Sequence, residues 1–349
     1  MLITGGAGFI GSNLAVSFKQ KYSELKVIVL DNLKRRGSEL NVNRVKEKGI
    51  EFIHGDIRNQ EDLELKDKID ILLDCSAEPS VLSGYGKSPA YIINTNLVGT
   101  INCLELVRKN NADVVFLSTS RVYPYNVINN IKTTEADTRF EWAEIQDTKI
   151  AGWSKYGIDE NFIHRGAKSM YGATKYCSEV LLQECMSMNG MKWVINRCGV
   201  IAGPWQFGKA DQGVFTHWML AHYFRKQLKY IGFGGKGKQV RDLLHIDDLF
   251  DLLDLQIKNI DNLNEGIYNV GGGEINLSLL ETTQMCEGIT GNRITIKSEP
   301  TTRPADLIIY KSNNQRISSI LNWKPKRNAE RILNDIYLWI RDNENLLTA

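Results

Sequence analysis

The stretch TGGAGFIG, Thr4 to Gly11, follows a short apolar strand and precedes a predicted helix that runs to about Lys21. Gly5 allows a tight turn, Gly8 lets a pyrophosphate approach the backbone, and Gly11 lets the helix pack closely on the sheet. The free N–H groups and the positive dipole end of such a helix then face an anion. Glycine-rich turns also occur without ligands, so the neighbouring residues must decide whether this turn binds a dinucleotide.

Strands and helices alternate through the first 200 residues, which predicts an α/β, Rossmann-type doubly wound parallel sheet. The predicted strands after the first are Lys26–Asp31, Ile50–Asp56, Ile69–Ala77, Ala112–Thr119 and Lys192–Arg197, and the predicted helices are Glu39–Lys48, Asn94–Arg108 and Tyr171–Met188.

Two changes of composition indicate the domain organisation. Residues 124–168 form a long polar excursion, which predicts a functional lid or wall. From about residue 199 the chain is richer in glycine and short segments, which predicts a smaller C-terminal α/β substrate lobe. We therefore expect a dinucleotide-binding Rossmann domain at 1–198 and a substrate lobe at 199–349, with residues near 240–265 returning to the first domain.

Composition excludes several classes of function. The net charge of +2 over 349 residues predicts neither a nucleic-acid partner nor a membrane surface. No apolar run of 18 residues occurs, and we expect no signal peptide. Six cysteines without a CxxC pair predict reduced thiols and a cytoplasmic location. Five histidines lack metal-ligand spacing, so we expect no metal site.

Acidic residues end two of the predicted strands. Asp31 lies 20 residues after Gly11, where a carboxylate accepts hydrogen bonds from the adenosine ribose and repels a 2′-phosphate, which favours NAD over NADP. The basic run at residues 34–36 argues the other way, because it can hold a 2′-phosphate. Asp56 and Ile57 follow the third strand, where they can contact the adenine edge or cap a turn. We expect NAD as the cofactor.

Tyr171 and Lys175, in SMYGATK, lie four residues apart and hence on one face of a helix. An ammonium group and a nearby positively charged nicotinamide lower the pKa of a phenol from its reference of about 10. The resulting phenolate can take a proton from a sugar hydroxyl while the carbon gives hydride to NAD. The spacing is common by chance, and it gains weight here from the glycine loop and from the hydroxyls at 118–120.

Together these strings resemble the extended short-chain dehydrogenase/reductase superfamily, the NAD-dependent sugar epimerases and dehydratases. The resemblance runs from Leu2 to about Trp323 and rests on TGGAGFIG, Asp31, NLVGT (96–100), STSRVY (118–123), YGATK (171–175) and GKQVRDLLHIDD (237–248). One departure is Pro124, which stands where a glycine usually follows the Val-Tyr pair.

The resemblance implies roles for individual residues. Tyr171 would be the base, Lys175 its partner and a ligand of the nicotinamide ribose, and Thr119 the hydroxyl that holds the reacting sugar oxygen. The predicted cofactor contacts are Gly5, Gly8, Phe9, Ile10, Gly11, Asp31, Asn32, Asp56, Ile57, Ser76, Ala77, Asn96, Tyr171, Lys175 and Cys198. The predicted substrate contacts are Thr119, Arg121, Gln206, Arg241 and Arg303.

Alternatives stay open for several of these substrate contacts. Arg241 and Arg303 suit a diphosphate because guanidinium groups bind phosphate in a bidentate manner. Arg241 can instead form a salt bridge with Asp242 or Asp247, and Arg303 can be a solvated loop residue. Residues 211–212 can read the substrate or form a turn.

Three longer strings, DNLKRRGSELN (31–41), INRCGVIAGPWQFGKADQG (195–213) and YIGFGGKGKQVRDLLH (230–245), most resemble epimerases that invert carbon 2 of a CDP-hexose. The expected reaction is a transient oxidation with hydride return, in which NAD stays tightly bound and is not consumed. A UDP-sugar 4-epimerase, a nucleotide-sugar reductase and a catalytically silent NAD-binding protein are the alternatives.

The residues after Thr119 argue against one related reaction. Dehydratases of this superfamily carry an Asp-Glu pair there, whereas this chain has Ser120 and Arg121, which cannot perform that acid–base work. The family also implies a homodimer formed through the helix that carries Tyr171 and the helix that follows Asn96.

Overall fold

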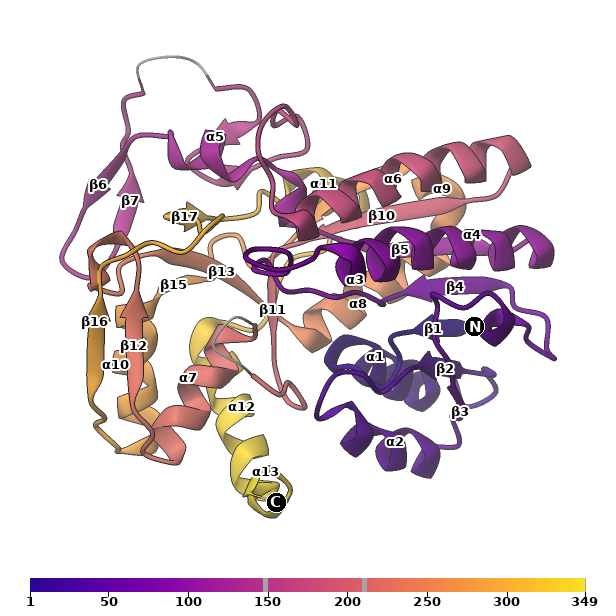
Figure 1. Cartoon of the computed structure of the whole chain (residues 1–349), viewed down its shortest axis with the longest axis horizontal. Helices are drawn as coiled ribbons and strands as arrows, with labels where there is room; N and C mark the ends of the chain where they lie inside the picture. Colours follow the sequence, from indigo (N-terminus) through magenta and orange to yellow (C-terminus); the bar gives the residue numbers. More distant parts are fainter. Residues whose placement is uncertain (147–149, 209–211, 349) are drawn as a thin grey trace. The chain divides into compact units, whose positions relative to one another are not determined.

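A computed structural model of the chain describes residues 1–146, 150–208 and 212–348, and these residues form two compact units (Figure 1). Unit 1 comprises residues 1–122, 170–197 and 250–268. Unit 2 comprises residues 123–169, 198–249 and 269–349, apart from the positions outside the described ranges. The domain boundary expected at residue 198 stays a prediction, and residues 123–169 group here with unit 2.

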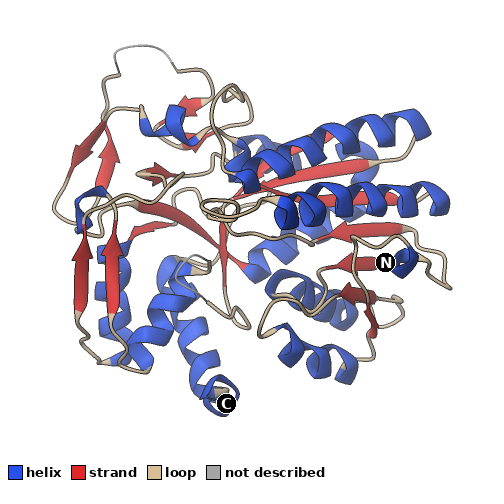
Figure 2. Ribbon diagram, viewed as in Figure 1, coloured by secondary structure: helices blue, strands red, loops and turns tan. Residues whose placement is uncertain are grey.

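The central sheet has seven strands in the order β14-β10-β5-β4-β1-β2-β3. Strands are red and helices blue in Figure 2. These strands are β1 (Leu2–Thr4), β2 (Ile28–Asp31), β3 (Glu51–His54), β4 (Ile71–Asp74), β5 (Asp113–Thr119), β10 (Trp193–Cys198) and β14 (Gly266–Val270). The pairs of β1 with β2 and β4, of β2 with β3 and of β4 with β5 are parallel. The predicted doubly wound parallel sheet is thereby confirmed.

The helical segments that accompany this sheet begin close to the predicted positions. They are α1 (Phe9–Lys21), α2 (Ser38–Glu47), η1 (Glu61–Leu63), α3 (Ala90–Ile93), a π-helical turn η2 (Asn94–Val98), α4 (Gly99–Asn110), η3 (Ser120–Val122), α6 (Met170–Asn189), α8 (Ile246–Lys258) and α9 (Ile260–Leu263). The helix expected to begin at Asn94 instead starts at Ala90 and contains the π turn. The carbonyl of Asn96 in that turn accepts hydroxyl hydrogen bonds from Thr100 and Ser178.

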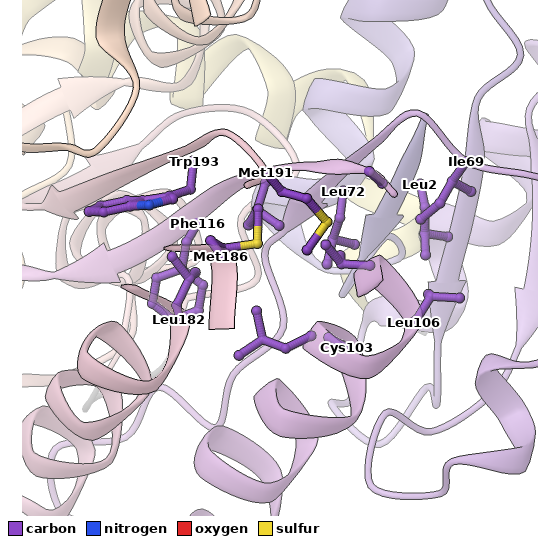
Figure 3. Packing of buried hydrophobic residues seen from close by; sticks show 14 of the residues in the cluster. Leu2, Ile69, Leu72, Cys103, Leu106, Phe116, Leu182, Met186, Met191 and Trp193 are labelled. Carbon is purple, nitrogen blue, oxygen red and sulfur yellow. The ribbon is translucent and has the colours of Figure 1, made fainter. Parts of the chain in front are cut away.

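The core of unit 1 fills the space between the sheet and its helices (Figure 3). Leu2, Leu72 and Phe116 from three neighbouring strands are at most 1% exposed, and Leu182 and Met186 of α6 are fully buried. Burial of such side chains stabilises the fold by roughly 1.5–3 kcal/mol each. This packed core therefore holds the strand ends, and the first residues of the loops that follow them, in defined positions.

Unit 2 combines small sheets with a group of helices. Its strands are β11 (Val200–Ala202), β13 (Val240–His245), β15 (Asn276–Ser278) and β17 (Ile309–Tyr310) in one sheet, the pair β12 (Leu228–Ile231) and β16 (Ile296–Glu299), and the hairpins β6 (Thr133–Glu135)–β7 (Phe140–Trp142) and β8 (Trp153–Ser154)–β9 (Gly157–Ile158). Its helical segments are α5 (Tyr125–Asn129), α7 (Val214–Tyr223), η4 (Phe233–Gly235), α10 (Leu279–Thr290), α11 (Gln315–Leu321), α12 (Ala329–Asp342) and α13 (Glu344–Thr348). Within the described ranges, no helix is long and apolar enough to cross a membrane.

The polar excursion is anchored inside unit 2 by buried side chains. Tyr123, Ile158 and Phe162 are each at most 1% exposed. The Tyr123 hydroxyl donates to Asn269 Oδ1 at 2.7 Å, and Asn269 Nδ2 donates to the carbonyl of Ile158 at 2.8 Å. Because a buried hydrogen-bonded network of this kind is costly to open, these contacts hold the excursion to unit 2 at its start, Tyr123, and at Ile158.

Candidate active site

The glycine loop between β1 and α1 leaves no room for side chains. Gly5 has a φ of +62°, which favours glycine, and a Cβ added to Gly11 would lie 2.3 Å from the carbonyl oxygen of Gly5. The residue before α1 is Gly8, which has no side chain to cap the first turn of the helix, where Phe9 and Ile10 lie. The first backbone N–H groups of α1 are therefore not capped by the side chain of that residue, as a phosphate-binding helix requires.

Asp31 ends β2 and ties that strand to the glycine loop. Its carboxylate accepts the N–H of Ala7 at 3.1 Å and the N–H of Leu33 at 2.8 Å. Burial raises the pKa of this carboxyl group, and the backbone N–H groups of Leu33, Ala7 and Gly8 oppose the rise. An ionised carboxylate has about four lone-pair sites, so this one can also accept a ribose hydroxyl.

Asp56 and Asn32 meet at the ends of β3 and β2. The Asn32 side-chain amide donates to Asp56 Oδ2 at 2.9 Å, and Arg58 donates to both carboxylate oxygens, at 3.0 Å from Nε to Oδ1 and at 2.5 Å from Nη2 to Oδ2. The Arg58 guanidinium, helped by Asn32, lowers the pKa of Asp56 to about 2. Sequence reasoning missed Arg58, although its position two residues after Asp56 was a usable signal. Ile57 is buried beside Gly99.

Replacement of Arg58 by alanine is expected to raise the pKa of Asp56 from about 2 toward its ordinary value of 3.8. In the intact protein the folded-state pKa is depressed, so the carboxylate contributes stability that is present above pH 4 and is lost as the pH falls toward about 2. Carboxyl-carbon NMR measures the titration, and Arg108→Ala, which removes an exposed pair with Glu105, is the control. An Asp56 pKa that stays near 2 in Arg58→Ala would contradict this account.

Asn96 connects the loop after β4 with the helix that carries Tyr171. Its Oδ1 accepts the N–H of Glu78 at 2.7 Å, while Nδ2 donates to the carbonyl of Glu78 at 3.1 Å and to Thr174 Oγ1 at 3.2 Å. Thr174 lies between Tyr171 and Lys175 on α6. Sequence reasoning missed Glu78 and Thr174, because their contact with Asn96 spans many residues and leaves no local pattern.

Ser76 and Ala77 begin the loop that Asn96 holds. The N–H of Ser76 donates to Asp74 Oδ1 at 3.0 Å, and the same oxygen accepts the Thr4 hydroxyl at 2.7 Å. Asp74 and Thr4 are buried at the ends of β4 and β1. This carboxylate therefore fixes Ser76, one of the two predicted cofactor residues, against the strand that precedes the glycine loop.

Tyr171, Lys175 and Thr119 come from neighbouring elements of unit 1. Helix α6 packs against β5, which ends at Thr119, and against the turn η3 that contains Arg121. Lys175 is only 1% exposed, and its Nζ lies 3.8 Å from the centroid of the Phe116 ring. Thr119 Oγ1 accepts the N–H of Arg121 at 3.2 Å, which orients the hydroxyl.

The other predicted site residues belong to unit 2. Arg241 is paired with Asp306 at 2.7 Å, which is neither of the partners considered from the sequence. Burial lowers the pKa of this guanidinium, although it stays charged beside Asp306. The carbonyl of Arg303 accepts the N–H of Asp306 at 3.3 Å.

Gln206 and Cys198 are both buried. The Gln206 amide donates to the carbonyl of Ile201 at 3.0 Å and accepts the Thr216 hydroxyl at 2.7 Å, so it is engaged within unit 2. Its predicted contact with a substrate stays a prediction. Asp211, which was considered as a substrate contact, lies outside the described residues. In the described ranges no group of His, Cys, Asp and Glu could hold a metal ion.

Comparison with known proteins identifies the family. The NAD dependent epimerase/dehydratase family matches residues 1–271. The chain is 30% identical to the CDP-paratose 2-epimerase of Salmonella typhi over 97% of this chain and 98% of that protein. It is 26% identical to a UDP-glucose 4-epimerase of Cyamopsis tetragonoloba over 98% of this chain and 95% of that protein.

Solved structures show the same fold. The UDP-glucose 4-epimerase of Thermus thermophilus, in complex with NAD, is 26% identical and superposes with a TM-score of 0.77 over 97% of this chain and 98% of that chain. The family match covers more than half of the 349 residues and agrees with the resemblance seen in the sequence. The protein therefore belongs to the NAD dependent epimerase/dehydratase family, within the extended short-chain dehydrogenase/reductase superfamily.

Proposed function

We propose that the protein is a nucleotide-sugar epimerase that inverts carbon 2 of a CDP-hexose. The observation that carries the proposal is the placement of Tyr171 and Lys175 on the helix α6, packed against the strand end that carries Thr119. As a member of its family, the protein is an NAD-dependent enzyme that acts on nucleotide sugars. The carbon that is inverted and the nucleotide that is bound are the parts we propose.

The residues of unit 1 fit the cofactor. The glycine loop would hold the pyrophosphate. A Cβ at Gly5 or Gly11 would collide with backbone atoms, so the loop is built for residues without side chains, and its backbone stays accessible to a phosphate. Asp31 and Asn32 would hold the adenosine ribose, Asp56 and Ile57 the adenine, and Ser76, Ala77 and Asn96 the region toward the nicotinamide. When bound, NAD supplies a hydride acceptor that later returns the hydride. Since the reaction is redox-neutral, we propose that NAD stays tightly bound and is not consumed.

Tyr171 takes the proton from the sugar hydroxyl in this proposal, and returns it at the end. The Lys175 ammonium stabilises the phenolate and would also hold the nicotinamide ribose through its remaining N–H donors. Thr119 donates a hydrogen bond to the sugar oxygen as it becomes a carbonyl. The resulting ketosugar presents its opposite face before the carbon is reduced, which inverts the centre.

Loss of water is not part of the proposed reaction. It requires an acid for the leaving hydroxyl and a base for the neighbouring C–H proton, which the superfamily's dehydratases supply directly after the position of Thr119. Ser120 here is a buried hydroxyl, and Arg121 is a permanent cation. We assign Arg121 to the substrate instead, where its guanidinium can bind an oxygen of the sugar or phosphate.

The contacts proposed in unit 2 recognise the rest of the substrate. Arg241 and Arg303 would bind the diphosphate, with Arg241 exchanging or sharing its present partner Asp306. Gln206 and Cys198 are retained as proposed contacts of the substrate and the cofactor. The similarity to CDP-paratose 2-epimerase across nearly the whole chain supports CDP as the nucleotide.

Incubation of the purified protein with CDP-paratose or CDP-glucose, followed by NMR at carbon 2, tests this function. We expect inversion at carbon 2 without net change in NAD. Unchanged configuration at carbon 2 with both sugars would reject the proposal. The second candidate, a UDP-sugar 4-epimerase, is favoured by the UDP-glucose 4-epimerases among the relatives, and inversion at carbon 4 of a UDP-hexose in the same assay would support it.

We also propose that the protein is a homodimer formed through α4 and α6. These helices pack against each other and expose Ile101, Val180 and Leu181 to solvent, and Val98 at the end of the preceding turn η2 is exposed as well. A second copy of the chain would cover this apolar face. The cytoplasmic location stays a prediction.

Replacement of Ile101, which is 44% exposed, by glutamate is expected to convert the dimer to a monomer. A charge placed in the apolar centre of an interface is left without water or a partner, which is costly. Light scattering coupled to gel filtration measures the mass. Leu338→Glu on α12 of unit 2, 40% exposed, is the matched control and should leave the mass unchanged. A monomeric wild-type protein would refute the proposed dimer.

A further inference from the structure

A buried carboxylate, Glu179, lies one helical turn beyond Lys175 on α6 and contacts two strands. The Ser118 hydroxyl of β5 donates to Glu179 Oε1 at 2.5 Å. Arg197 of β10 donates to Glu179 Oε2 from Nε at 3.1 Å and from Nη2 at 2.8 Å. The side chains of Glu179 and Arg197 are 0% and 5% exposed. One carboxylate thus holds a hydroxyl and a guanidinium away from water.

Stability alone does not account for this arrangement. Removing two charges from water carries a desolvation penalty, and apolar residues of similar volume often give equal or greater stability than a buried ion pair. An ion pair differs from apolar packing in its directionality, because a guanidinium and a carboxylate pair in few orientations. The feature that such a pair supplies is therefore a defined position of the helix on the sheet.

Glu179 and Ser118 lie on the two elements that carry the proposed catalytic residues, and Arg197 lies on the strand next to β5. Strands β5 and β10 are neighbours in the sheet, and Ser118 directly precedes Thr119. Tyr171, Lys175 and Glu179 follow one another at intervals of four residues, which places them on one face of α6. The Glu179 carboxylate therefore ties the helix face that bears Tyr171 and Lys175 to the strand end that bears Thr119.

We propose that Glu179 is a positioning residue, which acts through Ser118 and Arg197 to hold α6 in the register that sets Tyr171 and Lys175 against Thr119. The inference rests on the proposed function, because it assumes that Tyr171 transfers the proton with the help of Lys175 and Thr119. Reacting groups must be aligned closely, and a displacement of about 1 Å can cost about a hundredfold in rate.

The double variant Glu179→Met/Arg197→Met tests the proposal in the holoenzyme. It keeps the net charge and the approximate side-chain volumes, so we expect a melting temperature close to that of the wild-type protein. We expect kcat to fall by about tenfold or more while KM changes little, because the loss concerns alignment rather than binding. We also expect Tyr171 to ionise at higher pH, because the phenol moves relative to Lys175.

The ionisation of Tyr171 is followed by phenolate absorbance, as the difference between each protein and the same protein carrying Tyr171→Phe. This readout needs no sugar substrate. If wild-type protein epimerises no nucleotide sugar, the proposed function fails, while the ionisation of Tyr171 still decides the positioning role.

Ser118→Ala is the milder companion variant, since it leaves the ion pair intact and releases only β5 from Glu179. It should lower kcat and raise the pH at which Tyr171 ionises, both to a smaller extent. If the double variant does not fold, Ser118→Ala alone tests the positioning role of Glu179. Asp254→Asn is the control: this carboxylate of α8, 5% exposed, binds the ammonium of Lys21 at the end of α1 and the hydroxyl of Tyr22, the next residue. It should lower the melting temperature and leave Tyr171 unchanged. Wild-type kcat and wild-type Tyr171 ionisation in the folded Glu179 and Ser118 variants would overturn the proposal.

Discussion

Replacement of Tyr171 by phenylalanine is expected to lower kcat by about 10²–10⁴-fold, the usual contribution of a positioned acid–base group. The ring can keep its place on α6, since phenylalanine lacks only the hydroxyl. Because that hydroxyl is the group proposed to carry the proton, KM and the amount of bound NAD should change little. Epimerisation rates measured by NMR, together with the NAD content of the purified variant, test both parts of the expectation.

Tyr176→Phe provides a matched control on the same helix. Tyr176 lies five residues after Tyr171 and is half-buried, so its side chain leaves α6 in a different direction. We expect its removal to change kcat by less than about threefold, as a substitution outside the reacting groups should. A Tyr171→Phe protein with wild-type turnover would show that another group moves the proton. The proposed roles of Lys175 and Thr119 would then be wrong as well, because both depend on Tyr171 as the base.

The parts of the site that sequence could predict are those set by short stretches of chain. The glycine loop and Asp31 belong to one strand–turn–helix–strand unit, in which the spacing of residues fixes the geometry. Tyr171 and Lys175 lie on one face of a helix for the same local reason. Thr119 and Asn96 needed the family resemblance, because nothing in their local sequence distinguishes them from other residues at the end of a strand or in a helix.

The parts that sequence could not predict depend on contacts between distant residues. Glu179 meets Ser118 61 residues away, and Asn96 meets Thr174 78 residues away. Arg241 shows why near neighbours can mislead. Adjacent residues of a strand point to opposite faces, so Arg241 cannot readily pair with Asp242 next to it on β13. Asp242 instead accepts the N–H of Ser312 at 2.9 Å, and Arg241 reaches Asp306.

Replacement of Gly11 by alanine is expected to remove bound NAD from the purified protein. The added Cβ would lie 2.3 Å from the carbonyl oxygen of Gly5 and 2.8 Å from the Cα of Gly6. Both are backbone atoms, so the glycine loop itself must move, and overpacking of this kind typically costs about 1–3 kcal/mol of folding free energy. Cofactor absorbance after purification and the melting temperature measure the two effects.

Gly288→Ala separates this effect from a general response to alanine. Gly288 lies within α10 of unit 2, and a Cβ placed there meets nothing within 4 Å. The substitution should therefore stabilise the helix by about 0.5–1 kcal/mol and leave NAD bound. In Gly11→Ala, the Gly5 carbonyl must move to admit the added methyl group, and this movement changes the surface of the glycine loop that the pyrophosphate would contact. If Gly11→Ala nevertheless retained NAD at the wild-type level, the proposed close approach of the pyrophosphate to this loop would be wrong.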